Sequence, residues 1–112
     1  LISRGTDGGM VGERVQQILL QAGSEFPTSA KVAALLHMSE STLQRHLAKE
    51  GYRYQQLLDQ VRYRLALEYL NGTNLPVAEI ASLLGFSDAT NFRRSFKRWS
   101  NSTPSAVRTS AS

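Results

Sequence analysis

The side chains of this sequence that are best suited to chemistry are polar or basic, and they gather in two short stretches. The stretches contain, in chain order, Ser41, Thr42, Gln44 and Arg45, and then Ala89, Thr90, Asn91, Arg93 and Arg94. Arginine can donate two hydrogen bonds to guanine, and asparagine or glutamine can pair in the same way with adenine. Both stretches therefore suit the reading of base edges, although each polar residue could also be an ordinary solvated side chain. Three further cations, Lys49, Lys97 and Arg98, are better suited to phosphate contacts.

Sets of residues for catalysis or metal binding are missing from the sequence. It contains no cysteine and two isolated histidines, His37 and His46, which leaves no thiolate ligand, cysteine nucleophile or metal cluster. No serine lies in a nucleophile elbow, and no glycine-rich loop follows a strand. We therefore expect no enzyme activity, no metal and no cofactor. His37 is expected to be structural, and His46 is a further candidate for a phosphate contact.

The overall charge fits a polyanion as the partner. The 112 residues carry a net charge of +4, and four cations lie between positions 93 and 98. A basic patch of this kind can be the footprint of a polyanion, and the alternative is a solvated helix face. Composition does not separate DNA, RNA and an acidic protein. Because no run of about 18 apolar residues and no signal peptide is present, we expect a cytoplasmic protein with no membrane partner.

The spacing of apolar residues predicts an all-α fold, since it follows the helical period and no segment alternates as a strand does. The predicted helices lie at about 11–22, 29–36, 40–50, 54–70, 76–84 and 88–99, with a last short turn from 104 to 108. Gly51 is well placed to end the third helix in a left-handed conformation.

An internal repeat organises these helices. Residues 32–40 (VAALLHMSE) match residues 80–88 (IASLLGFSD) identically or by a chemically close residue, except for His37 against Gly85. The two copies lie 48 residues apart up to the break and 49 residues apart after it, because the second copy has one extra residue just after its turn. Each copy reads as a helix, a three-residue break and a second helix, which is the helix-turn-helix pattern.

The repeat also predicts core and capping residues. Leu36 and Leu84 should fill the angle between the two helices of each copy, and we expect Leu83 to be buried as well. The candidate caps of the second helices are Ser39 in the first copy and Ser87 or Asp88 in the second.

The second helix of each copy, at about 40–50 and 88–99, carries one of the two polar stretches. Two hairpins packed for stability alone would share the pattern, because tight helical turns are common. Two tandem copies, each with an arginine-bearing second helix on a basic chain, favour DNA binding. The predicted divisions are a flexible leader (1–10), a first helix-turn-helix subdomain (11–53), a linker helix (54–71), a second helix-turn-helix subdomain (72–108) and a tail (109–112).

The sequence resembles the DNA-binding domain of the AraC family of bacterial transcription regulators. The resemblance runs from about residue 11 to residue 108 and is strongest in the second copy. Its motifs lie at 76–88 (PVAEIASLLGFSD) and 92–99 (FRRSFKRW), at Thr103, Pro104, Ser105 and Arg108, and in the first copy at Val32, Ala33, Met38, Ser39 and 42–45 (TLQR). Two positions depart from the family pattern. Asn101 replaces a usual glycine and can still adopt a positive φ, and Val107 replaces a usual aromatic residue.

The resemblance implies seven helices in two helix-turn-helix subdomains joined by a long linker helix. It implies a sequence-specific regulator, expected to be an activator associated with the nucleoid, whose partner is double-stranded DNA. It also implies an effector-binding or dimerisation domain on an N-terminal segment. RNA polymerase is a further candidate partner. The alternative function is a helical interaction module that contacts RNA polymerase without reading sequence.

The long helix suggests how the site on DNA is divided. Residues 54–70 should form a helix of roughly 25 Å, at 1.5 Å per residue. Successive major grooves repeat about every 34 Å, so this helix could hold two recognition helices in two of them. Because the two copies differ in sequence, we expect an operator that is not palindromic.

Overall fold

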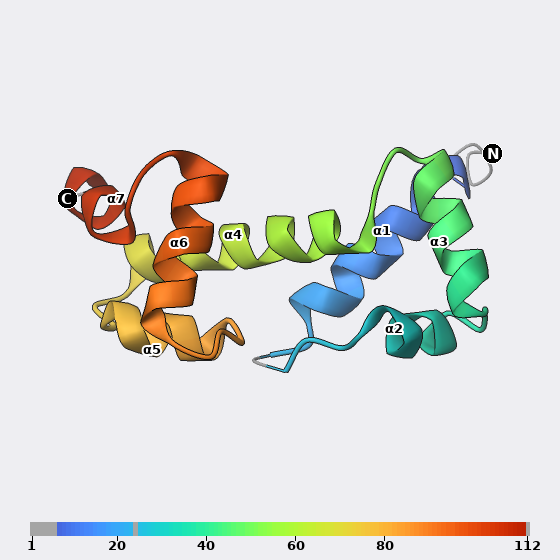
Figure 1. Cartoon of the computed structure of the whole chain (residues 1–112), viewed down its shortest axis with the longest axis horizontal. Coiled ribbons are helices and arrows are strands. Elements are labelled where there is room, and N and C mark those ends of the chain that lie inside the picture. The colour runs from blue at the N-terminus through green and yellow to red at the C-terminus, as the bar shows by residue number, and fades with distance from the viewer. Residues whose placement is uncertain (1–6, 24, 112) are drawn as a thin grey trace. The chain divides into compact units, whose positions relative to one another are not determined.

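The structure, a computed structural model, describes residues 7–23 and 25–111, and this part of the chain is all-α (Figure 1). The seven helices are α1 (Asp7–Leu20), α2 (Ser29–Leu35), α3 (Glu40–Lys49), α4 (Tyr54–Gly72), α5 (Val77–Leu83), α6 (Ala89–Ser100) and α7 (Pro104–Ala111). The predicted fold class and number of helices are thus confirmed. α2 with α3, and α5 with α6, are the two helix-turn-helix pairs.

The helices divide into two compact units whose boundary lies inside α4. Unit 1 contains α1, α2, α3 and α4 as far as Val61, and unit 2 begins in α4 at Arg62 and contains α5, α6 and α7. The linker helix predicted at 54–71 is therefore shared between the two units. Leu57 and Val61 are buried in its first half, and Ala66 and Leu70 in its second.

The core of unit 1 is aliphatic. Its buried side chains are Val11, Val15, Leu19, Val32, Ala33, Leu36, Leu43, Leu47, Leu57 and Val61. The Tyr54 hydroxyl donates to the Pro27 carbonyl at 2.6 Å, which ties the start of α4 to the segment before α2. The Glu50 carboxylate accepts from the Gly12 N–H at 2.9 Å, which joins the end of α3 to α1. Within unit 1, α3 packs against both α1 and α2.

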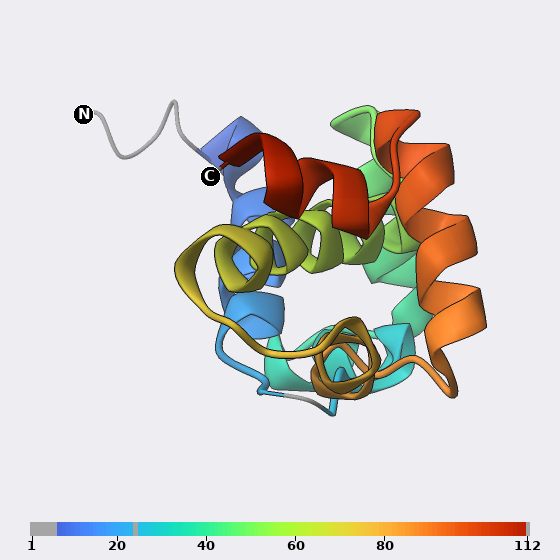
Figure 2. The same ribbon diagram turned by 90° about the vertical axis from the view of Figure 1, so that its left-hand side faces the viewer.

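The core of unit 2 is largely aromatic. Phe92 and Phe96 are fully buried, and their ring centroids lie 5.8 Å apart. Phe86 lies 5.5 Å from Phe92, and Tyr63 of α4 lies 5.6 Å from Phe96. Trp99, which lies 6.1 Å from Phe86, completes the cluster. Figure 2 shows α5, α6 and α7 around the second half of α4, with α5 and α6 crossing steeply. The cluster fixes one face of α6 and leaves the opposite face outside.

One core prediction was wrong. Leu84 is fully buried and Leu36 is buried, as expected, but Leu83 is only half-buried. Its counterpart in the first copy, Leu35, is 52% exposed. Neighbouring residues of a helix point about 100° apart, so in each copy only the second leucine of the pair faces the angle between the helices.

The ends of the first and last helices also differ from the prediction. α1 begins at Asp7, inside the predicted leader, and α7 continues to Ala111, inside the predicted tail. Helix propensity is a weak guide at such ends, and local side-chain bonds support α7: Thr103 Oγ1 accepts from the Ala106 N–H at 3.1 Å. The rest of the predicted leader and tail, residues 1–6 and 112, lies outside the described residues.

Candidate nucleic-acid interface

The two turns that precede α3 and α6 have the same backbone geometry. In the first copy the Met38 N–H donates to the Ala33 carbonyl at 3.0 Å, and in the second the Phe86 N–H donates to the Ala81 carbonyl at the same distance. This bond closes a Schellman motif, which ends a helix with one left-handed residue. That residue is His37 (φ 61°) in the first copy and Gly85 (φ 82°) in the second. The one dissimilar pair in the repeat thus adopts the same conformation.

Both α3 and α6 begin with a side-chain cap, as predicted. Ser39 Oγ accepts from the Thr42 N–H at 3.1 Å, and Asp88 Oδ1 accepts from the Asn91 N–H at 2.8 Å. Each bond satisfies one of the N–H groups that the first turn of a helix leaves without a partner. Of the two candidates in the second copy, Asp88 is therefore the cap. Because each cap follows a fixed turn, the first residues of α3 and α6 are set rigidly on their units.

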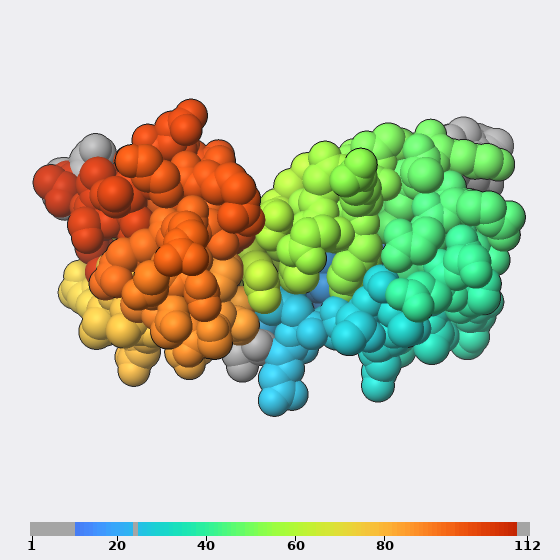
Figure 3. All heavy atoms as spheres, viewed as in Figure 1, coloured from blue at the N-terminus to red at the C-terminus, as the bar shows by residue number. Residues whose placement is uncertain are grey.

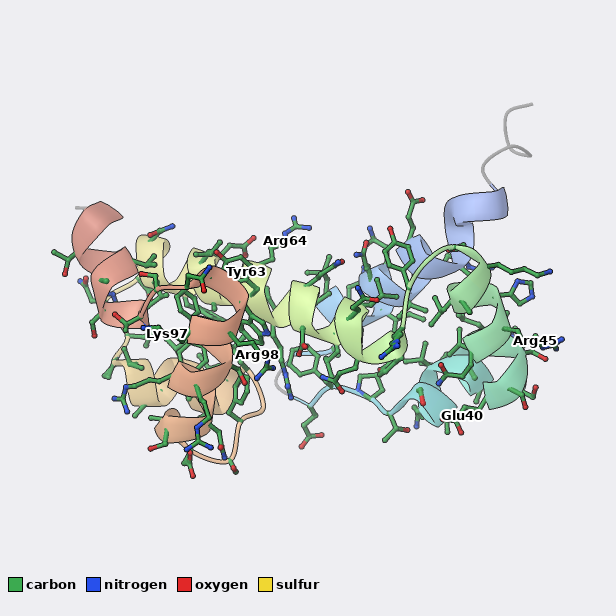
Figure 4. The ribbon with its side chains drawn as sticks, turned by 45° about the horizontal axis from the view of Figure 1, so that its top comes forward. Glu40, Arg45, Tyr63, Arg64, Lys97 and Arg98 are labelled. Carbon is green, nitrogen blue, oxygen red and sulfur yellow. The ribbon has the colours of Figure 1, made fainter. Side chains whose placement is uncertain are left out.

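The outer face of α3 carries the predicted polar set. Leu43 and Leu47 are fully buried on its inner face. Thr42 is half-buried, and the residues exposed on the outer face are Ser41, Gln44, Arg45 and Lys49. In Figure 4 the labelled Arg45 points away from the helices of unit 1. Together with His46, Arg45 and Lys49 line a small surface hollow of about 50 Å³, which is suited by charge to an anion.

The outer face of α6 is more strongly basic. Its exposed residues are Thr90, Asn91, Arg93, Arg94, Lys97 and Arg98, while Ala89 is half-buried against the aromatic cluster. α6 contains no acidic residue between Ala89 and Ser100. Figure 3 shows α6, in orange, at the surface of unit 2, and Figure 4 labels Lys97 and Arg98 of this helix. The positive charge of this face would attract phosphates, while contacts of these residues with DNA stay predictions.

α3 differs from α6 because it begins with an acidic residue. Glu40 lies in the first turn of α3, where a negative charge interacts favourably with the helix dipole. Its carboxylate accepts a hydrogen bond from the Ser29 hydroxyl of α2. This bond fixes the start of α3 against α2. Because α6 has no acidic residue in its first turn, the two helices differ in charge pattern.

Arg108 belongs to the family motif in the sequence, but its role in unit 2 appears only in the structure. Arg108 of α7 donates to the carbonyls of Leu70, Leu75 and Thr73 at 3.2, 2.6 and 3.1 Å, and to that of Tyr69 at 3.4 Å. The last turn of α4 contains no basic residue of its own. Arg108 therefore caps the C-terminus of α4 from a distant part of the chain. No pattern in the sequence around Arg108 predicts this contact.

Comparison with known proteins places the chain in a family. A family model described as a helix-turn-helix domain matches residues 32–110. The chain is 50% identical over 95 residues to the ornithine utilization regulator of Pseudomonas aeruginosa, and 44% identical over 77 residues to the urease operon transcriptional activator of Escherichia coli. These matches cover 85% and 69% of this chain, but only 28% and 26% of the relatives.

A solved structure shares the arrangement of the helices. The DNA-binding domain of the global transcriptional factor AdpA, in complex with a target DNA, matches with a TM-score of 0.73 and 26% sequence identity. The match covers 92% of this chain and 90% of that one. The chain belongs to the AraC-type helix-turn-helix family of DNA-binding transcription regulators, and that family is not one of enzymes.

Two further findings bear on other classes of protein. Among the described residues, no helix has both the length and the apolar character needed to cross a bilayer. In the same part of the chain, no three His, Asp or Glu side chains come together as metal ligands would.

Proposed function

We propose that this chain is the sequence-specific DNA-binding part of a bacterial transcription regulator, with α3 and α6 as its two recognition helices. Each helix enters a major groove of the operator, and the two grooves follow one another along the DNA. The observation that carries this proposal is the repetition within one chain of a capped, arginine-bearing helix on the same Schellman turn. A single such helix is common, whereas two of them suit a protein that reads two blocks of bases.

Affinity and specificity come from different residues in this proposal. Lys49, Lys97 and Arg98 contact phosphates, which contributes affinity without sequence preference. The residues that face the bases are Ser41, Thr42, Gln44 and Arg45 on α3, and Ala89, Thr90, Asn91, Arg93 and Arg94 on α6. Half-buried Ala89 can contribute apolar contact with a thymine methyl group.

The alternative, a module that binds RNA polymerase without reading sequence, is less well supported. The centres of protein interfaces are poor in charge and rich in apolar and aromatic residues. The outer faces of α3 and α6 have the opposite composition, and among the described residues the large exposed hydrophobic side chains are Leu35 and Tyr52. RNA polymerase therefore enters only as a second partner of a regulator that is already bound to DNA.

The rest of the regulator is also a matter of proposal. We propose an additional effector-binding or dimerisation domain, because the relatives are more than three times as long as the matched part. Its N-terminal position follows from the resemblance to the AraC family. We further propose that the regulator activates transcription on the bacterial nucleoid, in the cytoplasm.

A selection from randomised double-stranded DNA tests the proposal. We expect one asymmetric motif made of two blocks, centred about 10–10.5 base pairs apart. An insertion of about half a helical turn between the blocks should lower affinity to that of a single block, and an insertion of about a full turn should lower it less. Binding without any enriched motif would contradict the proposal and favour the protein-interaction alternative.

A further inference from the structure

We propose that Ser39 and Thr42 hold the guanidinium of Arg45 in place before DNA binds, and so make α3 a reader of guanine. The inference rests on the proposed function, because it concerns how α3 recognises its block of bases. Thr42 is then a positioning residue that acts through Arg45.

A chain of hydrogen bonds joins the three residues. Ser39 Oγ, which caps α3, donates to Thr42 Oγ1 at 2.9 Å. The Nη2 atom of Arg45 donates to the same Thr42 Oγ1 at 3.1 Å. Residues three apart share a face of a helix, and long side chains fold back toward its N-terminus. The cap, the threonine and the arginine therefore form one connected group at the start of α3, the part of a recognition helix that meets base edges.

The donors and acceptors of this group determine what it can bind. A threonine hydroxyl has two acceptor lone pairs and one O–H donor, and Thr42 Oγ1 already accepts from two partners. In this arrangement, with Ser39 Oγ as the donor, both lone pairs of Thr42 Oγ1 are used and its O–H is the group left for a base. Arg45 keeps four of its five N–H donors and has no acceptor. The groups that Thr42 and Arg45 can offer to a base are thus donors only.

Guanine is the base that matches such a pair. In the major groove guanine presents two acceptors, N7 and O6, whereas adenine and cytosine each present an amino donor that would face the donors of the protein. Thymine presents one acceptor beside a methyl group. The ligand inferred for this part of α3 is therefore the major-groove edge of a guanine.

The hydrogen bond from Arg45 to Thr42 also increases the preference for guanine over the other bases. An exposed arginine loses rotamer freedom when it binds, and immobilising such a side chain lowers affinity by a factor of about three to ten. An arginine that is already oriented loses less. Because the remaining donors of the pair match the two acceptors of guanine, the gain is expected for guanine and not for the other bases.

Unit 2 provides a natural comparison, because Asn91 and Arg94 occupy the positions of Thr42 and Arg45 in the repeat. The Asn91 amide nitrogen donates to Ser87 Oγ at 2.9 Å, away from the arginine. Among the residues that the structure describes, no hydrogen bond or ion pair joins Arg94 to another side chain. Only α3 carries the pre-oriented arginine, so its block should show the sharper guanine preference.

The test measures dissociation constants of the 112-residue chain on its selected site, with each of the four bases at the position that depends on Arg45. Thr42→Val keeps the shape of the side chain and removes the acceptor, and it should lower the guanine preference about threefold to tenfold. Thr42→Ser keeps the hydroxyl and should retain the preference. Arg45→Ala should abolish it, and the double variant Thr42→Val/Arg45→Ala should behave like Arg45→Ala alone, since the threonine acts through the arginine.

Asn91→Ala is the matched control, because it should alter only the block read by α6. A wild-type guanine preference that survives Thr42→Val would overturn the inference and leave the proposed function standing. Losses that add in the double variant, or a Thr42→Val loss that is equal for all four bases, would overturn it in the same way. Failure of the wild type to select any motif would instead contradict the proposed function itself.

Discussion

Arg108→Ala is expected to destabilise unit 2 strongly, although the residue lies outside both recognition helices. A hydrogen bond to a charged group contributes about 1.5–3 kcal/mol, and the contributions of bonds made by one group do not simply add. The Tyr69 carbonyl keeps its bonds from the N–H and hydroxyl of Thr73. The loss therefore falls mainly on the carbonyls of Leu70 and Leu75, which bond to Arg108 in a part-buried setting. We expect a loss of about 2–4 kcal/mol.

The assay is urea unfolding followed by the fluorescence of Trp99, the one tryptophan of the sequence. Trp99 packs in the aromatic cluster of unit 2, so its emission reports on that unit. Arg108→Lys should recover only part of the loss, because an ammonium is a point donor that cannot span the same carbonyls. Arg93→Ala, which removes an exposed arginine of α6, should change stability by no more than about 0.5 kcal/mol. A loss below about 0.5 kcal/mol for Arg108→Ala would refute the capping role.

Three further changes test other parts of the structure. Leu84→Ala should cost about 2–5 kcal/mol in the same unfolding assay and half-buried Leu83→Ala clearly less, and equal losses would contradict the packing of α5 on α6. His37→Gly should raise the stability of unit 1 by up to about 1 kcal/mol, because a left-handed residue with a side chain is strained. Stability is measured by circular dichroism, and a loss of stability would show that the imidazole has a structural role. Lys97→Ala should weaken binding to all DNA sequences alike and reduce the slope of log affinity against log salt by about 0.9, whereas an unchanged slope would remove Lys97 from the phosphate contacts.

Features that depend on neighbouring residues could be predicted from the sequence. The caps Ser39 and Asp88 each serve an N–H three residues away, and a serine or aspartate before an apolar run is a sufficient signal. The same holds for the left-handed residues Gly51 and Asn101, which adopt φ values of 86° and 60°. The outer faces of α3 and α6 follow from helical periodicity once the inner face is known.

Features that depend on residues far apart in the chain could not be predicted. The contacts of Arg108 with α4 and with the segment that follows it span 33 to 39 positions, and nothing near Arg108 in the sequence indicates them. The division of α4 between two units depends on which helices pack on each half, although its apolar stripe looks continuous. The bond from Arg45 to Thr42 is local, yet it depends on a rotamer, and residue types alone do not distinguish that rotamer from a solvated one.

The central claim, that α3 and α6 read separate blocks of bases, is tested most directly by a selection on randomised DNA with three proteins. The wild type, Arg45→Ala and Arg94→Ala are compared at one salt concentration. The two-helix account predicts that each variant loses base preference in one block and keeps it in the other, with a cost of about 1–3 kcal/mol for each lost bidentate contact. The account would be contradicted by a palindromic wild-type motif, or by two variants that lose base preference at the same base pairs.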